Sequence, residues 1–231
     1  MAEVKSARPA ATTENEAVIE RAKDFWGRFG KTISIILGAI ILVVAAIFIH
    51  KNFISGPKEK KANDAIFRAQ EYYSQDSLDK ALNGDGQYLG FEKIINQYGG
   101  TKAGELAKFY AGSIYLKKGN FDKAVKYLKD FDTDAPQIKA RTYKLLGDAY
   151  AEQNKGKDAV EEYKKAAHSF EEDDAASSEA LFLAAYLSDK VLKDRNAAIE
   201  LYKEVKTKYP FTQWGNEADK YLAQNGVYNV E

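Results

Sequence analysis

The chain has 231 residues, and its 34 lysine and arginine residues balance its 34 aspartate and glutamate residues. It contains no cysteine and two histidines, which excludes disulfide frameworks, thiol chemistry, zinc fingers and three-histidine metal centres. Because the formal net charge is zero, we expect no nucleic-acid partner, and the composition also leads us to expect no metal and no cofactor.

The N-terminal 31 residues precede a strongly apolar run. Residues 1–13 are small and polar, which predicts disorder. Over residues 14–31, apolar side chains recur at helical spacing between charged ones, which predicts an amphipathic helix at the membrane interface. A contact with another membrane protein is the alternative use of this helix. Aromatic and basic side chains favour the headgroup region, so the candidate interface residues are Phe25, Trp26, Phe29 and Lys31.

Residues 32–49 form a predicted transmembrane helix. Fifteen of these 18 residues are apolar and none is charged, and 18 helical residues extend over about 27 Å, close to the ~30 Å of a bilayer core. A buried core helix would keep a polar edge, and a cleaved signal peptide would carry a small-residue cleavage site after Ile49. We therefore favour an uncleaved signal anchor, followed by a linker over residues 50–57. Basic residues flank both ends equally, so charge alone leaves the orientation open.

Residues 58–231 contain an internal repeat of about 35 residues. Two windows, ending at Pro136 and Glu172, align without gaps and resemble the tetratricopeptide repeat. Glycine and alanine at the matched positions would let two antiparallel helices approach each other closely. The matched pairs are Gly112 with Gly147, Tyr115 with Tyr150, and Ala124 with Ala159.

Two looser repeats and one further helix complete this region. One repeat covers about 178–210, and a degenerate one lies upstream, with its first helix over 58–75 and an insertion over 77–86. A last helix over about 213–223 would cap the stack. No stretch alternates with a period of two. The sequence therefore predicts an all-α fold: a single transmembrane helix, then an α-solenoid of about four tetratricopeptide-like hairpins over 58–231.

The sequence shows no combination of residues at the spacing that a known catalytic or metal-binding motif requires. Asp130, Asp132 and Asp134 alternate as in an EF-hand, but Ala135 and Arg141 stand where that loop needs glycine and glutamate. His168 has no acid at a suitable spacing on its own helical face, which favours a helix-end histidine over a general base. We therefore predict that the protein is not an enzyme.

The predicted function is binding of other polypeptides. In tetratricopeptide arrays the first helix of each repeat lines the concave side, and mixed charges with aromatic side chains there suit an extended polypeptide. Phe109 and Phe182 have an alternative role as packing between repeats. The candidate groove residues are Phe109, Ser113, Lys117, Arg141, Lys144, Asp148, Glu152, Phe182, Tyr186 and Asp189.

The order of elements resembles the ancillary SecYEG translocon subunit (YfgM-like) family. The resemblance lies in residues 14–42, with an acidic opening, a basic and aromatic stretch, Gly30, Lys31 and the apolar run, and it continues through the repeats. A longer N-terminal extension, with Pro9, departs from the family pattern. The resemblance implies an anchor in the bacterial inner membrane, a cytoplasmic N-terminus and a periplasmic repeat domain.

The same resemblance implies partners. These are membrane lipid, the SecYEG translocon, a membrane-anchored periplasmic chaperone of the peptidyl-prolyl isomerase type, and unfolded secreted chains. The alternative is a structural scaffold subunit of another cell-envelope assembly or secretion complex. A stoichiometric, detergent-stable complex would favour the scaffold.

Overall fold

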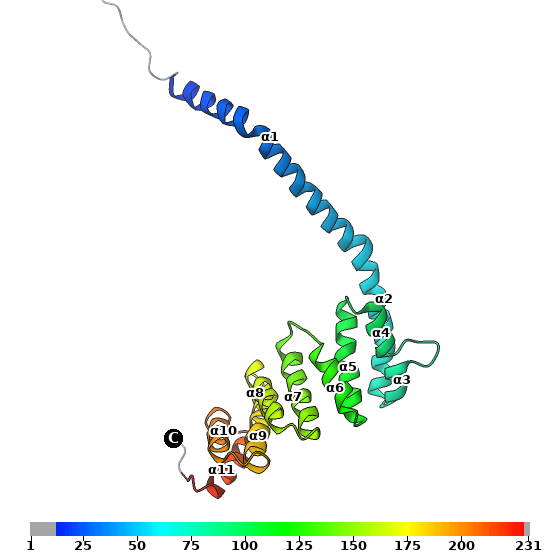
Figure 1. Ribbon diagram of the computed structural model, residues 1–231, viewed down its shortest axis with the longest axis vertical. Helices are drawn as coiled ribbons and strands as arrows, with labels where there is room; N and C mark the ends of the chain where they lie inside the picture. The colour runs from blue at the N-terminus through cyan, green and yellow to red at the C-terminus, as the bar shows by residue number, and fades with distance from the viewer. Residues whose placement is uncertain (1–12, 229–231) are drawn as a thin grey trace, which may run out of the picture. The chain divides into compact units, whose positions relative to one another are not determined.

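The computed structural model describes residues 13–228, and these residues are all-α, as predicted (Figure 1). The only extended pairing within them is one isolated bridge between Gly84 and Leu89. The chain divides into two compact units, one ending at Pro57 and the other beginning at Lys58. The disorder predicted for residues 1–13 lies outside the described residues, except for Thr13, which begins the first helix.

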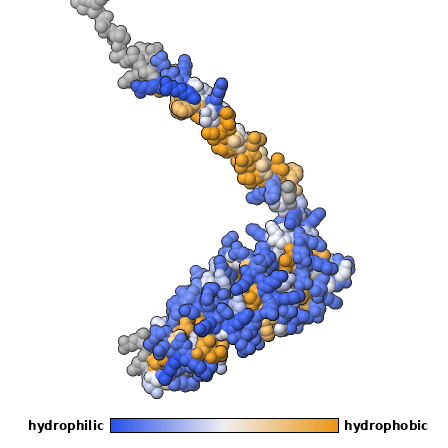
Figure 2. All heavy atoms as spheres, viewed as in Figure 1, coloured by the Kyte–Doolittle hydropathy of each residue, from blue (hydrophilic) through white to orange (hydrophobic). Residues whose placement is uncertain are grey.

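The first unit is dominated by α1 (Thr13–Ile49), one continuous helix of 37 residues. Its segment Val18–Ile49 is long and apolar enough to cross a membrane, and its most apolar 18-residue stretch is not buried inside the protein. Figure 2 shows hydrophobic residues along most of this helix. The 32 residues extend over about 48 Å, more than the ~30 Å of a bilayer core, so part of the helix would lie beyond the hydrocarbon.

Residues 50–57, for which the sequence predicts a linker, are helical instead. A π-helical segment, η1 (His50–Ser55), follows α1 directly, and α2 begins at Gly56. Gly56 donates its backbone N–H to the carbonyl of Lys51, five residues earlier, which is the hydrogen bond that defines a π-turn. The backbone groups here are satisfied by helical bonds, which an irregular linker would leave to water.

The second unit is a stack of helices in which neighbours along the chain pack together (Figure 1). Helices α2, α5, α7 and α9 are the first helices of the four predicted repeats, and α4, α6, α8 and α10 are the second helices. The bounds are α2 (Gly56–Ser74), α3 (Leu78–Asn83), α4 (Phe91–Tyr98), α5 (Lys102–Lys117), α6 (Phe121–Lys129), α7 (Pro136–Glu152), α8 (Gly156–Ser169), α9 (Asp174–Lys190), α10 (Arg195–Lys208) and α11 (Gln213–Gln224).

The two repeat glycines lie where the helices of a hairpin approach most closely. A Cβ atom on Gly112 would lie 2.6 Å from Cγ of Leu128, and one on Gly147 would lie 2.5 Å from Cδ1 of Tyr163. Both distances are below normal contact, so only glycine fits without a shift. The predicted role of these glycines in hairpin packing is therefore confirmed.

The same kind of turn connects α4 to α5 and α10 to α11. Thr101 caps α5, since its Oγ1 accepts from the Gly104 N–H at 3.0 Å and donates to the Tyr98 carbonyl at 2.7 Å. A glycine is required as the third residue of α5, because a Cβ there would lie 2.0 Å from the Tyr98 carbonyl oxygen. The equivalent contacts at α11 are made by Tyr209, Thr212 and Gly215.

The insertion between α2 and α4 is held by Asp85. One carboxylate oxygen of Asp85 accepts from the backbone N–H groups of Tyr88 (2.8 Å) and Gln87 (3.0 Å), and the other accepts from the Tyr72 hydroxyl (2.7 Å). These bonds, first the one from the Tyr88 N–H and then the one from Tyr72, lower the pKa of Asp85.

We expect Asp85→Asn to lower the free energy of unfolding at pH 7. The folded-state pKa of Asp85 is lower than its ordinary value of 3.8, so the stabilisation is present above that value and is lost as pH falls through the folded-state pKa. Urea unfolding of both proteins at pH 7, 5 and 3 measures the difference, which should be equal at pH 7 and 5 and smaller at pH 3. A difference independent of pH would contradict this assignment.

Candidate functional site

A groove of about 420 Å³ lies between the first helices α7 and α9, and we call it the α7–α9 groove. Its walls come from α7 and α9, and the last turn of α8 closes one side. Small side chains make the hollow, since four alanines stand where larger residues would fill it. The lining residues are Gln137, Ala140, Arg141, Lys144, Ala166, Phe170, Asp173, Ala176, Ser177, Glu179 and Ala180.

Two of the predicted groove residues, Arg141 and Lys144, line this groove. Lys144 Nζ lies 3.2 Å from Asp148 and 3.5 Å from Glu179, so its charge links α7 to α9. Burial acts to lower the pKa of Lys144, but the two carboxylates outweigh it and leave the pKa raised. Lys144 is therefore charged, and its ammonium group is already paired with two carboxylates of the protein.

Asp148 connects this ion pair to the hairpin core. Its other carboxylate oxygen accepts from the Tyr163 hydroxyl at 2.7 Å. Burial of Tyr163, followed by the charge of Asp148, raises the pKa of the phenol far above its ordinary value, so the hydroxyl remains a donor. Asp148 thus serves the groove indirectly, by holding Lys144.

Arg141 has a different role. Among the described residues its guanidinium has no carboxylate within ion-pair distance, and it lies 5.9 Å from the centre of the Phe109 ring. Its side chain is exposed. Arg141 is therefore the cation of this groove that is available to a ligand.

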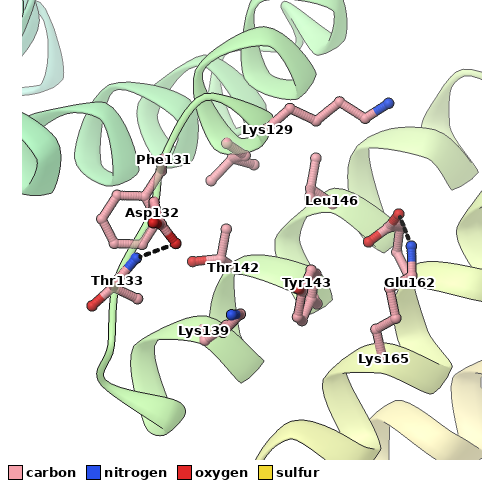
Figure 3. Close-up of a pocket in the computed structure, with 11 residues that line it drawn as sticks. Lys129, Phe131, Asp132, Thr133, Lys139, Thr142, Tyr143, Leu146, Glu162 and Lys165 are labelled. Carbon is pink, nitrogen blue, oxygen red and sulfur yellow. Dashed lines mark hydrogen bonds and ion pairs between the residues drawn. The ribbon is translucent and has the colours of Figure 1, made fainter.

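A second, smaller hollow lies between α6, α7 and α8 (Figure 3). None of the ten predicted groove residues lines it. The sequence pattern offers little indication of it, because its residues come from three helices and one loop.

Three predicted groove residues are buried instead of lining a groove. Phe109 is 7% exposed, and it packs with Leu128 and Leu146 and against the Phe131 ring. Ser113 is 6% exposed, and its Oγ lies 3.0 Å from the Tyr73 hydroxyl. For Phe109 the alternative of packing between repeats is the one that the structure supports.

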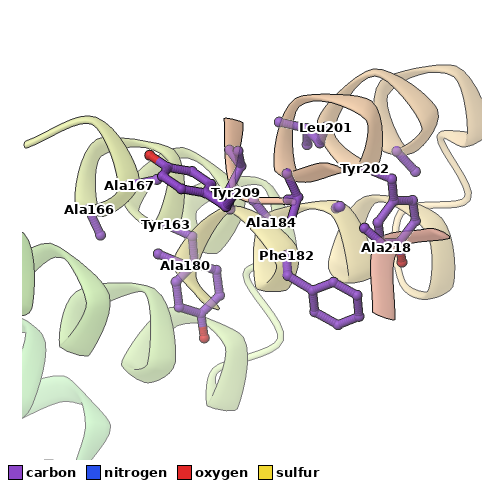
Figure 4. Packing of buried hydrophobic residues seen from close by; sticks show 14 of the residues in the cluster. Tyr163, Ala166, Ala167, Ala180, Phe182, Ala184, Leu201, Tyr202, Tyr209 and Ala218 are labelled. Atoms are coloured by element: carbon purple, nitrogen blue, oxygen red, sulfur yellow. The ribbon is translucent and has the colours of Figure 1, made fainter. Parts of the chain in front are cut away.

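Phe182 is the third buried residue, at 5% exposure (Figure 4). Its ring lies 4.8 Å from Trp214 of α11 and 5.5 Å from Tyr202 of α10, measured between ring centres. Such aromatic contacts each contribute about 1 kcal/mol beyond the burial of area. Phe182 therefore joins α9 to the final hairpin and the capping helix.

The remaining predicted residues lie toward the other end of the first helices. Lys117 Nζ lies 3.6 Å from Asp76, and Glu152 is exposed at the end of α7. Tyr186 is 38% exposed, and Asp189 lies 2.6 Å from Lys190 Nζ. The structure does not bring these residues into the α7–α9 groove.

The predicted membrane-interface residues share one stretch of α1. The rings of Phe25 and Phe29 lie 5.1 Å apart, and Trp26 folds over Gly30, whose missing side chain leaves room for the indole. Lys31 is exposed and directly precedes the apolar run. Their interfacial role stays a prediction.

His168 contacts two acidic side chains that its helical face did not lead us to expect. Its Nδ1 lies 3.0 Å from Glu171, and its Nε2 lies 3.7 Å from Glu204 of α10. Lys208 contacts both carboxylates, at 3.0 and 3.1 Å. The cluster joins α8 to α10, and sequence spacing could not show Glu204 because it lies 36 residues away. Within the described residues there is no group of three acids or histidines able to hold a metal ion.

Comparison with known families identifies tetratricopeptide repeats in this chain. The tetratricopeptide repeat family model matches residues 106–137 and 179–212. The first match covers most of α5, all of α6 and the start of α7, and the second covers most of α9, all of α10 and the turn after it. No curated protein matches the chain.

Proposed function

We propose that the chain is a membrane-anchored adaptor whose tetratricopeptide repeats bind a segment of another polypeptide in the α7–α9 groove. Tetratricopeptide domains mediate protein–protein interactions, and α1 is long and apolar enough to hold such a domain at a membrane. The observation that carries the proposal is the guanidinium of Arg141, which has no carboxylate partner among the described residues and lines a groove with four alanines.

The groove favours a particular kind of segment. Alanine side chains leave space for an aliphatic side chain, whose burial would contribute about 1.5–3 kcal/mol. An acidic side chain of the same segment would pair with Arg141, whose planar guanidinium binds a carboxylate through two hydrogen bonds. Lys144 is already neutralised by Asp148 and Glu179, so it would add little attraction.

For the cellular setting we propose an ancillary subunit of the SecYEG translocon in the bacterial inner membrane. The N-terminus would be cytoplasmic, and the repeats would meet emerging chains or a membrane-anchored chaperone in the periplasm. The support is the resemblance of residues 14–42 to that family. Anchoring would raise the effective concentration of the groove near its clients, so weak affinity for each chain would suffice.

We expect Arg141→Glu to weaken binding of the polypeptide partner about tenfold, since loss of a central charged contact typically costs more than 1 kcal/mol. The measurement is photo-crosslinking in membranes from a reactive residue at Gln137, which lines the groove. Lys164→Glu provides the control, because it makes the same charge change at an exposed position outside the groove.

Two outcomes would contradict parts of the proposal. Equal adduct yields from Arg141→Glu and Lys164→Glu would exclude the groove as the binding site. Adducts without translocon subunits or periplasmic chaperones would exclude the proposed setting, as would protease protection that places residues 58–231 in the cytoplasm.

A further inference from the structure

The hollow between α6, α7 and α8 has an apolar floor and a polar rim (Figure 3). Its volume is about 210 Å³, below the ~300 Å³ at which pockets for drug-sized ligands begin, so it suits one side chain. Leu128 and Leu146, at 1% and 3% exposure, form the floor together with Phe131. The polar and aromatic lining comprises Lys129, Asp132, Thr133, Lys139, Thr142, Tyr143, Glu162 and Lys165.

Glu162 is the unusual member of this lining. The residue is 8% exposed, and its Oε1 accepts from Lys165 Nζ at 3.0 Å. Its Oε2 is buried and has no hydrogen-bond donor among the described residues. A buried carboxylate oxygen without a donor destabilises the folded state, so a ligand that supplies a donor here would be stabilised.

The charges at the rim restrict what could supply that donor. Lys165 is held by Glu161 (2.8 Å) as well as by Glu162, and the hydrogen bonds to these two carboxylates raise its pKa, so it stays charged. Lys129 lies 5.4 Å from the Tyr150 ring, and Lys139 is exposed. Three lysines therefore oppose a basic ligand, and the buried Glu162 carboxylate opposes an acidic one.

We infer that this pocket binds a tryptophan or tyrosine side chain of a bound polypeptide. The indole N–H or phenol O–H donates to the Glu162 carboxylate, and the ring packs on Leu128 and Leu146. A neutral aromatic side chain with one polar end supplies both the hydrogen-bond donor and the apolar ring. A lysine at the rim is attracted to the face of that ring. The terminal torsion of glutamate is broad, so a rotation brings the buried oxygen to the donor.

The inference rests on the proposed function only in assigning the ligand to a polypeptide. The pocket and the α7–α9 groove share no lining residue, so the two sites are separable. A client that fills both would gain affinity from two weak contacts joined by one chain.

The test uses the full chain in nanodiscs with ¹³C-labelled leucine methyl groups. Leu128 and Leu146 report on the pocket, and Leu222, buried at the other end of the stack, serves as the internal control. N-acetyl-tryptophanamide and N-acetyl-tyrosinamide should shift the two reporters saturably. N-acetyl-phenylalaninamide, which lacks the donor, should bind at least about tenfold more weakly.

Two variants separate the hydrogen bond from general packing. Glu162→Leu should remove the preference for the donor-bearing amides. Glu161→Leu should keep it, because Glu161 contacts the same lysine from an exposed position. The amides report on the pocket and the adducts from Gln137 report on the α7–α9 groove, so a failed groove and a failed pocket give different results. Thermal unfolding of each variant establishes that the repeats remain folded.

Three results would overturn the inference. Equal binding of the three amides would remove the donor from the recognition. An absence of saturable shifts at Leu128 and Leu146 would mean that the pocket holds only water. Tighter binding of N-acetyl-argininamide than of the aromatic amides would show that the site takes a cation.

Discussion

Replacing Gly104 with alanine should destabilise the repeat domain by about 1–2 kcal/mol. Alanine is the better helix former by about 1 kcal/mol, but a Cβ at this position would lie 2.0 Å from the Tyr98 carbonyl oxygen and 2.5 Å from its carbon. These are backbone atoms, so the clash is relieved only by moving the turn between α4 and α5. Overpacking of this kind costs about 1–3 kcal/mol and here exceeds the gain in propensity.

The matched control is Gly100→Ala, four residues earlier in the same turn. A Cβ on Gly100 would have no neighbour within 4 Å, so we expect a change within about 0.5 kcal/mol. Urea unfolding followed by circular dichroism measures both variants. Equal stability of the two variants would show that the close approach at Gly104 is not required by the fold.

The double variant Ile40→Lys with Val43→Lys should abolish membrane insertion. Both residues lie near the centre of the apolar run, and each lysine at the centre of a membrane helix costs about 2.5–3.5 kcal/mol. The combined cost of about 5–7 kcal/mol corresponds to a shift of several powers of ten in the partition equilibrium. The protein should therefore leave the alkaline-washed membrane fraction.

Ile19→Lys is the control for this experiment. Ile19 is as exposed on α1 as Ile40, at 54% and 53%, but it precedes the apolar run by more than three turns. The Ile19→Lys protein should therefore remain in the membrane fraction. Retention of the double variant after alkaline washing would show that residues 32–49 are not the anchor.

Helix type and repeat period were predictable because they depend on local pattern. Gly112 and Gly147 recur at a fixed spacing, and each leaves room for one residue of the second helix, Leu128 or Tyr163. The family matches lie on α5–α6 and α9–α10, two of the predicted hairpins. The α-solenoid is therefore readable from sequence, since each repeat contacts its immediate neighbours.

The binding surface was predicted less well. Phe109, Ser113 and Phe182 occupy first-helix positions that a single helical wheel would turn toward a ligand, but they are buried. Their burial comes from partners in other repeats: Leu146 covers Phe109, Tyr73 meets Ser113, and Trp214 covers Phe182. Sequence spacing within one helix does not specify how far the next hairpin reaches over it.

The composition and order of this chain by themselves determined three things: an apolar helix without charge, helical hairpins of about 35 residues, and the absence of cysteine chemistry. These follow from side-chain hydropathy and from glycine at fixed spacing, which act over a few helical turns. The tertiary structure alone decided that Lys144 is held by Asp148 and Glu179, and that, within residues 13–228, Arg141 has no carboxylate partner and one Glu162 oxygen has no donor. Charge pairing and burial depend on side chains from different repeats, and their distances are set only when the hairpins stack.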